Sequence, residues 1–493
     1  MKTKYVSILT AIAAVATLAS CNKDLNPVKV DTDQPAENLR TITLSFDAPT
    51  KSNVTYYSEE GYVPYFEVGD KILVSNGTQS EICKVFENKS SAMVVLNNPM
   101  AITTKLEGPL TAVYPSSAAL CNEEGNAIIG YKVPSEQSGR FADANICMAD
   151  QNEVLKSGDV LRFTTRVAIL KFYTKDMGVE KITITSSGAD IASGKESPKQ
   201  ITLEPQSLEI NPEIGQASGV EPEFWYAAVN VSEGVTGSDL TFKSEATTQD
   251  EPVVKTSTSN VSLSPNTMYN AFIPYYIKVQ VASEEYQYWG YCNVGAFTPD
   301  EDGEFFMWGE VRGHRADFVV GNNEAFKNDF SSFPFDDERY NNNLVDYAGF
   351  KWENTPFISN PEDSTFSKYI QSDNKTTLEV EDDAATRNWG EGWRMPTKDE
   401  FEKLLNSKND LTFRRIGSGE VAYRRGYFET THYWSSSIYA DNVSLAYSLS
   451  TDNNAVETER RYKGYPIRPI YVKPSPEESF GVTVSPYTNF GTL

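Results

Sequence analysis

Residues 41–46 spell TITLSF, in which Ile42, Leu44 and Phe46 alternate with hydroxyl residues. This period of two buries one face of a β-sheet and leaves the other face in water, so the stretch predicts a strand. No helical periodicity of useful length occurs before Asp150. Residues 41–155 are therefore expected to form a β-sandwich or small barrel. Further strand candidates follow TITLSF, separated by turn residues: KILVSNG (71–77), SAMVVLNN (91–98), LTAVYPSS (110–117) and NAIIGYKVP (126–134).

Residues 156–282 show the same pattern a second time. Each of the two blocks has the length of a single sandwich domain. The expected strands of the second are LRFTTRVAILKFYT (161–174), EKITITSS (180–187), QITLEP (200–205), FWYAAV (224–229), LTFKS (240–244) and MYNAFIPYYIKVQVA (268–282).

The first twenty residues have the composition of an export signal. Two lysines precede an apolar run at 6–19, which is too short to span a bilayer as a helix. Cys21 follows Leu18-Ala19-Ser20, and this resembles the lipobox of bacterial lipoproteins. The resemblance implies a signal peptide over 1–20 and a lipid on Cys21 that fastens the mature protein to a membrane. The alternative is an ordinary secretory signal beside an incidental cysteine.

Residues 21–40 contain two prolines and little apolar periodicity, so they are expected to form a tether between lipid and body. Their first residues, Asn22-Lys23-Asp24, resemble the short charged tag of Bacteroidetes lipoproteins that face the cell exterior. We therefore expect a lipid-anchored protein of the outer membrane, exposed at the cell surface. Retention on the periplasmic side is the alternative.

Composition limits the possible functions of the chain. Its 493 residues predict several domains, and a net charge of −24 argues against nucleic acid as a partner. The remaining cysteines have no CxxC spacing, and free buried thiols are the simplest interpretation. They are Cys83, Cys121, Cys147 and Cys292.

Two segments of the sandwich region carry a family resemblance. VPYFEVGDKILVSNG (63–77) and YKVPSEQSGRFADANICMAD (131–150) resemble the Gly-Asp turn and the Pro-x-x-Gln stretch of the fimbrillin-like families of Bacteroidetes. The resemblance implies two tandem transthyretin-like sandwiches, 41–155 and 156–282, of the kind that form pilus stalks, anchors or tips. A generic β-sandwich lipoprotein is the alternative.

Fimbrillin-like subunits assemble by exchanging a strand, because an extended segment of another chain can complete an open sheet. TITLSF is the strand expected to exchange here. Arg40 stands just before it and, by the same resemblance, is a candidate site for proteolytic processing. An unprocessed subunit is the alternative.

A different kind of sequence begins near Tyr288, rich in tryptophan, glycine and asparagine. The strings WGYCNVGAFTPDEDGEFFMWGE (289–310), THYWSSS (431–437) and KGYPIRPI (463–470) resemble the Fibrobacter succinogenes major paralogous domain. The resemblance implies a C-type-lectin-like α+β domain over 283–475, followed by a tail at 476–493. The expected fold class is thus mainly β with an α+β C-terminal domain.

Local signals in this region predict its elements. Thr397 and Glu400 form a capping box for a helix, and Asp382-Asp383 and Arg387 suit the two ends of a shorter one. A hairpin is expected over 445–460. The tryptophans of the region are expected in the core, although such a ring can also stack on a sugar; they include Trp389, Trp393 and Trp434.

Catalysis is not expected. The related formylglycine-generating enzymes need active-site cysteines, whereas this region has Cys292 alone. His314 and His432 are the two histidines of the chain, and His432 precedes Ser435-Ser436-Ser437 on a presumed strand, where neighbouring side chains alternate faces.

No metal or cofactor is expected either. An acidic turn around Gly303 offers calcium-type ligands, but a solvated turn is the simpler interpretation. Its carboxylates are Asp300, Glu301, Asp302 and Glu304.

These features together predict a non-enzymatic surface lipoprotein. The two sandwiches would serve as a stalk, and the C-terminal domain would bind a glycan or a host or matrix protein. The alternative is a fimbrial structural or anchor subunit that joins other subunits by strand exchange.

Overall fold

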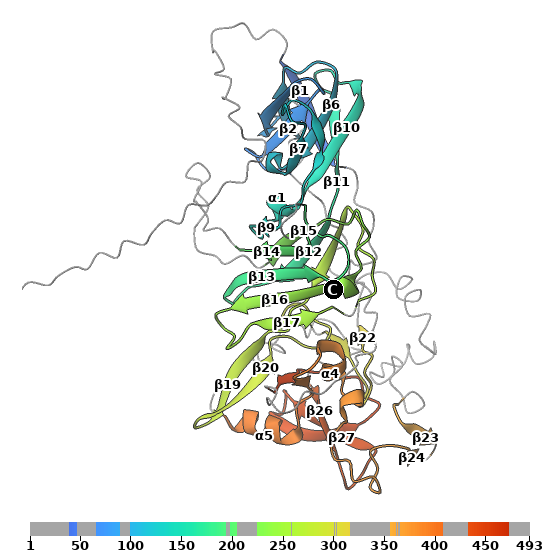
Figure 1. The fold of residues 1–493 in the computed structure, drawn as a ribbon. Helices are drawn as coiled ribbons and strands as arrows, with labels where there is room; N and C mark the ends of the chain where they lie inside the picture. Colours follow the sequence, from blue (N-terminus) through green and yellow to red (C-terminus); the bar gives the residue numbers. More distant parts are fainter. Residues whose placement is uncertain are drawn as a thin grey trace, which may run out of the picture.

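The structure is a computed structural model that describes residues 39–46, 66–88, 99–193, 198–204, 224–257, 259–299, 301, 303–315, 355–360, 362, 365–407 and 432–472. The chain is mainly β. Its strands form three successive blocks, which run from blue through green and yellow to red in Figure 1. Within the described ranges, no helix has both the length and the apolar character needed to cross a membrane.

The first block is an eight-stranded sheet with the strand order β3–β2–β6–β10–β11–β1–β5–β4. Its core is largely aliphatic, and Ile42, Ile72 and Ile102 are fully buried in it. A small hairpin completes the block, β7 (Ala119–Cys121) and β8 (Ile128–Tyr131), and one helical turn, α1 (Phe141–Ala144), packs against the second block, where Phe141 contacts Tyr226. The strands of the large sheet are β1 (Arg40–Phe46), β2 (Lys71–Ser75), β3 (Ser80–Lys84), β4 (Phe86–Glu87), β5 (Met100–Thr104), β6 (Pro109–Tyr114), β10 (Cys147–Val154) and β11 (Val160–Thr165).

β1, the TITLSF strand, lies inside this sheet. It runs antiparallel to β5, with Arg40 opposite Thr104, and parallel to β11, with Thr43 opposite Val160. Its alternating Ile42 and Leu44 point into the core, as the sequence predicts. The strand therefore has a hydrogen-bonded partner on both sides.

The second block packs two sheets face to face. One has the order β15–β12–β18 and the other β17–β16–β13–β14–β9. The core between them includes Leu170, Ile184 and Phe242, all fully buried. The strands are β9 (Glu136–Gln137), β12 (Ala168–Tyr173), β13 (Val179–Ser186), β14 (Gln200–Leu203), β15 (Phe224–Val229), β16 (Leu240–Ala246), β17 (Val253–Thr256) and β18 (Thr267–Ala271).

Two runs that the sequence suggested as single strands are divided between blocks. Residues 161–174 supply β11 to the first sheet and β12 to the second block. Residues 268–282 supply β18 to the second block and β19 (Tyr276–Ala282) to the third, with Pro274 between them. Apolar alternation continues through both joints, so the pattern alone does not reveal where the chain changes sheet.

Gln137 lies in β9, between β8 and β10 in the chain, and ties this segment to the strand β15. Its amide nitrogen donates to the carbonyls of Pro134 and Ala228, both at 2.9 Å, and its oxygen accepts from the Ala228 amide at 2.8 Å. The side chain thus completes the backbone hydrogen bonds at the end of β15. This gives a physical role to the Pro-x-x-Gln stretch.

The third block combines a four-stranded sheet, β19–β20–β29–β25, with a three-stranded sheet, β26–β27–β28. Two helices accompany them, α4 (Ala384–Trp389) and α5 (Lys398–Asn406). The core consists largely of aromatic rings. The remaining strands are β20 (Glu285–Gly290), β21 (Glu304–Phe305), β22 (His314–Arg315), β23 (Ile358–Asn360), β24 (Thr365–Phe366), β25 (Trp393–Arg394), β26 (His432–Ile438), β27 (Leu445–Ser450), β28 (Ala455–Arg460) and β29 (Ile470–Tyr471).

The local predictions for this block are confirmed. Thr397 and Glu400 form the capping box of α5, and Asp383 caps α4 by accepting from the Thr386 amide at 2.9 Å. β27 and β28 form the expected hairpin. The tryptophans are core residues: Trp434 is fully buried, and Trp389 and Trp393 are each 5% exposed.

Candidate functional site

Cys21, Asp300 and Asp302 are outside the described residues. Of the acidic turn, Glu301 accepts from the Phe297 amide at 2.8 Å, and Glu304 is buried. These two carboxylates thus serve the local fold.

Arg40 lies in the first block, far from the C-terminal block (Figure 1). Its guanidinium donates to the Leu155 carbonyl, and the Thr41 carbonyl accepts from the Gly158 amide at 2.8 Å. The peptide bond after Arg40 is therefore part of a paired strand. A protease could reach it only after the start of β1 had left the sheet.

The serines near His432 have structural partners. Ser435 donates to the Tyr447 carbonyl at 2.7 Å and Ser436 to the Pro396 carbonyl at 3.3 Å. His432 stacks on Tyr465 with ring centroids 5.0 Å apart. These contacts tie the strand β26 to its neighbours. The four cysteines after Cys21 are free, and Cys83, Cys147 and Cys292 are buried as expected, whereas Cys121 is half-buried.

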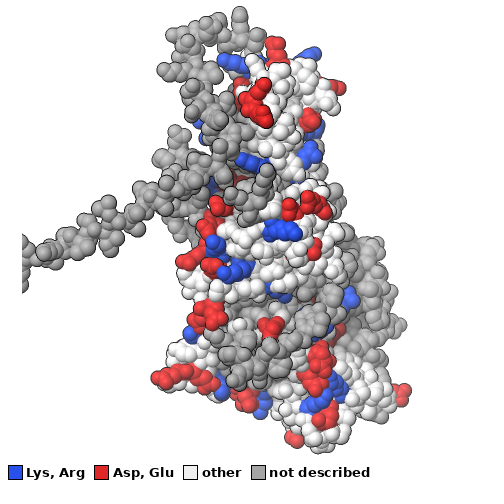
Figure 2. Space-filling model, viewed as in Figure 1, with Lys and Arg blue, Asp and Glu red and all other residues white. Residues whose placement is uncertain are grey.

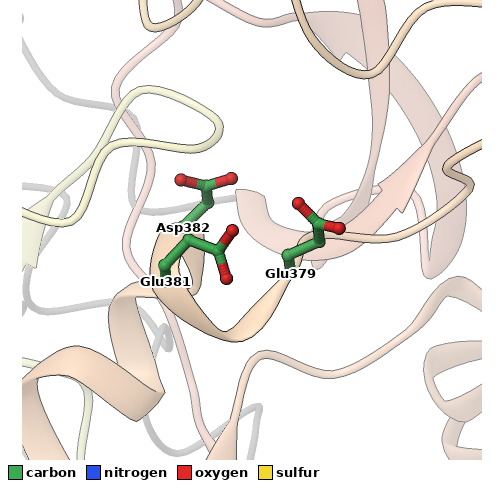
Figure 3. A group of neighbouring side chains, drawn as sticks. All are labelled: Glu379, Glu381 and Asp382. Carbon is green, nitrogen blue, oxygen red and sulfur yellow. The ribbon is translucent and has the colours of Figure 1, made fainter. Parts of the chain in front are cut away.

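Three carboxylates of the third block gather on one turn of the backbone (Figure 3): Glu379, Glu381 and Asp382. A lysine ammonium already compensates them, because Lys368 lies 2.7 Å from Glu379 and 3.2 Å from Glu381 and also pairs with Asp382. The hydrogen bonds from Lys368 and Lys375 lower the pKa of Glu379 to about 2. The arrangement is an ion-pair network that stabilises the turn before α4.

A concavity among the described residues lies where the second and third blocks meet. It has a volume of about 700 Å³, within the usual range of small-molecule sites. One wall is the edge strand β17 with the turn before it, residues 250–256, and the opposite wall includes residues 387–391 at the end of α4. We call this space the junction cleft.

Aromatic rings form the floor of the junction cleft. Tyr276 stacks on Tyr471 with centroids 5.5 Å apart, and Tyr288 meets Tyr276 edge to face at 5.1 Å. Trp393 contacts Tyr471 at 5.2 Å and Trp389 at 4.6 Å. Each ring is thus held by its neighbours, so this surface is fixed before any ligand arrives.

Gly392 allows the close packing of this floor. Its backbone has φ +85°, in the left-handed region, and a Cβ there would lie 2.6 Å from the Tyr471 ring. Gln249 fixes the other side, since it donates to the Tyr276 carbonyl at 2.8 Å and accepts from the Tyr276 amide at 3.1 Å. The turn before β17 and the aromatic floor are therefore mutually positioned.

Lys255 spans the junction cleft. It projects from β17 and donates to the carbonyl of Asn388, at the end of α4, at 2.8 Å. Burial lowers the pKa of Lys255 to about 8. The bond joins the two blocks and leaves the other ammonium hydrogens available to a ligand.

Sequence reasoning pointed to part of this site. Trp389, Trp393 and Arg387 were singled out there, but as core and helix-end residues. Lys255 and the strand β17 were not, because VVKT (253–256) is short and lies next to no recognisable motif. The sequence offers one weak sign of a site here, which is a lysine within a short run of β-branched residues.

Comparisons with known proteins give structural neighbours only. No protein-family model matches the chain, and no curated protein matches it. A candidate cell adhesion protein of Bacteroides uniformis is similar at 12% identity and TM-score 0.27, over 50% of this chain and 93% of the other. A second such protein, from Bacteroides ovatus, has 11% identity and TM-score 0.25, over 47% and 90%. The fimbrial anchor protein Mfa2 of Porphyromonas gingivalis has 12% identity and TM-score 0.20, over 51% and 97%.

Proposed function

We propose that this chain is a non-enzymatic lipoprotein of the outer membrane that binds a ligand outside the cell. A lipid on Cys21 would anchor it, the first two blocks would serve as a stalk, and the third block would present the ligand site. The structural neighbours are named as cell adhesion proteins and a fimbrial anchor protein, which supports a role of this coarse kind.

The order of the parts carries this proposal. The three blocks follow one another in space as they do in sequence, and the junction cleft lies between the second and third blocks, away from the first block, which contains the start of β1 (Figure 1). An anchor attached before β1 would therefore leave the cleft far from the membrane. An interspersed charge pattern suits exposure to water, and Figure 2 shows acidic and basic side chains mixed along the visible face.

The anchor can be tested with a clickable fatty acid fed to cells that make the protein. We expect label on the wild type and none on Cys21→Ala. Protease treatment of intact cells should then remove the third block from the wild type. Equal labelling of both proteins, or protection of the third block in intact cells, would contradict the proposal.

Adhesion is tested separately, by the attachment of these cells to immobilised mucin and matrix proteins. Cells that carry the wild type should attach more than cells that lack the gene. Cells with Cys21→Ala should resemble the latter, because that protein would not be retained at the surface.

A second candidate, a fimbrial subunit, is favoured by the position of β1. Its removal would open a groove between β11 and β5 that is lined by the partners of Ile42 and Leu44. Limited digestion with an arginine-specific protease, followed by crosslinking, distinguishes the two functions. Ladders that form only when Arg40 is present and cut would support strand exchange, and a monomer after complete cutting would argue against it.

A further inference from the structure

Two cations line the junction cleft without a counter-ion among the described residues. The Lys255 ammonium has the Asn388 carbonyl as its hydrogen-bond acceptor and forms no ion pair there. Arg387 lies next to Asn388 in the chain and also lines the cleft. Its guanidinium has no hydrogen bond or ion pair within the part of the chain that the structure describes.

The carboxylates of the same cleft do not compensate Lys255. Asp250 pairs with Lys278 at 3.3 Å, on the side of β19. Burial alone accounts for the lowered pKa of Lys255, and no carboxylate opposes it. Lys255 is half-buried. A partly desolvated cation that is not paired costs free energy, and a bound anion would recover part of it.

The aromatic floor beside these cations favours a ligand with a flat apolar face. Tyr288 and Tyr471 are partly exposed there. Glu251, Thr256 and Glu391 are exposed lining residues, which we call the rim. Their oxygens can accept hydrogen bonds from hydroxyl groups, although the Thr256 hydroxyl also contacts that of Thr241 at 3.1 Å. A pyranose has both kinds of surface, because its C–H groups form an apolar face and its hydroxyls point outward.

We propose that the junction cleft binds an acidic sugar, a pyranose that carries a carboxylate. The carboxylate would lie between Lys255 and Arg387, the ring would lie on the aromatic floor, and the hydroxyls would bond to the rim. This inference rests on the proposed ligand-binding function and names the ligand class. A strongly acidic peptide fits less well, because several of its carboxylates would meet Glu251 and Glu391.

The test uses the chain from Asn22 onward and calorimetric titration at low salt. The probes are trigalacturonate, a hyaluronan hexasaccharide and sialyllactose, each beside its methyl ester, together with a poly-glutamate peptide of equal charge. We expect at least one acidic sugar to bind and its methyl ester to bind at least tenfold more weakly. Failure of every acidic sugar, equal binding of acid and ester, or tighter binding of the peptide would overturn the proposal.

Variants locate the binding within the protein. Lys255→Met and Arg387→Gln should each weaken binding of the acidic sugar at least fivefold. Lys403→Met is the matched control, since Lys403 pairs with Glu285 on the exposed surface of the third block and should leave binding unchanged. If Lys255→Met and Lys403→Met bind the acidic sugar with equal affinity, the junction cleft is not the binding site.

The pKa of Lys255, followed by NMR, tests the same proposal without a measurement of sugar affinity. Reductive methylation with ¹³C-formaldehyde gives this lysine an NMR signal, which is assigned by its loss in Lys255→Met. Addition of the acidic sugar should raise its apparent pKa, since a carboxylate stabilises the ammonium. No change at saturating sugar would place the binding elsewhere.

The two proposals can fail independently. If cells adhere through the wild-type protein and Lys255→Met leaves adhesion unchanged, the cleft assignment fails and the adhesive function stands. If the sugar binds the cleft but cells with and without the protein adhere equally, the adhesive function fails and the sugar site stands.

Discussion

The first and third blocks achieve stability by different means. The first buries aliphatic residues that alternate along strands, such as Ile42 and Ile102. The third buries aromatic rings and two arginines, Arg461 and Arg468, both fully buried. Local alternation is enough to predict the first kind of core, whereas the second kind depends on single contacts between residues far apart in sequence.

The buried arginines show how specific those contacts are. Arg468 donates to Asn293 at 2.8 Å and to the carbonyls of Gly290 and Tyr291 at 2.9 and 2.7 Å. Arg461 lies between Phe366, at 3.9 Å, and Trp308, at 4.6 Å from ring centroid to guanidinium carbon. In the third block, loss of one side chain therefore removes several kinds of interaction together.

The largest effect should come from Trp434→Ala. This fully buried ring donates to the Phe306 carbonyl at 2.7 Å and packs on Tyr465, so its loss should cost about 3–5 kcal/mol. Tryptophan fluorescence during urea unfolding measures it, because of the seven tryptophans only Trp225 precedes residue 289. Leu44→Ala is the comparison: it should destabilise the first block and leave the fluorescence transition in place. If Leu44→Ala also lowers the urea midpoint of the fluorescence transition, the first and third blocks unfold together.

Gln137→Ala should have a smaller effect, at the joint between the first and second blocks. It leaves the Ala228 amide and carbonyl without their partner, which costs about 1–3 kcal/mol. Hydrogen exchange should rise at Ala228 and its neighbours in β15 and remain unchanged in β26. Gln137→Glu is the control, because it keeps the acceptor and loses the donor. Equal protection of β15 in the alanine variant and the wild type would contradict this role.

Lys255→Met tests the junction between the second and third blocks through its pH dependence. Below pH 8 Lys255 is protonated in both the folded and the unfolded chain. The wild type then carries the full free-energy cost of burying the ammonium. Between about pH 8 and 10.5 the folded chain releases the proton first, and the wild type should gain stability as the pH rises. The advantage of the methionine variant in urea midpoints should therefore shrink from pH 7 to pH 10. A constant difference would show that the charge is not buried.

Glu379→Gln should give the smallest effect, and only in part of the pH range. The folded pKa of Glu379 is lowered to about 2 from 4.5 by hydrogen bonds from Lys368 and Lys375, so its contribution is present above pH 4.5 and lost as the pH falls through 2. Thermal unfolding of wild type and variant should differ at pH 6 and converge near pH 2. Lys398→Met breaks an exposed ion pair with Glu402 and is the control. It shows how much the thermal stability changes when any surface charge is removed.

The sequence predicted strands and caps more successfully than their partners. The alternation of TITLSF and the Thr397–Glu400 box depend on neighbours within a few residues, and both are confirmed. The parallel pairing of β1 with β11 joins segments more than a hundred residues apart, and nothing in either strand specifies the other. Strand pairing of this kind is settled by the whole core.

The junction cleft shows the same limit for function. Its walls come from β17, β19, β20, the end of α4, β25 and β29, and no motif linked β17 to the others. Trp389 and Trp393 were noticed because tryptophan is conspicuous. The charge of Lys255 became informative only once its burial and its bond to Asn388 were known.

The parallel pairing of β1 and β11 also determines how the body would bear traction. Tension applied ahead of Leu39 enters at the start of β1, and an opposing force arrives through the end of β11, one of the places where the chain passes into the second block. The two forces then slide neighbouring strands past each other, so the hydrogen bonds from Thr43 to Phe46 share the load and do not open one at a time. Mechanical strength along the long axis would thus come from shear between two strands, in a body whose described cysteines form no disulfide.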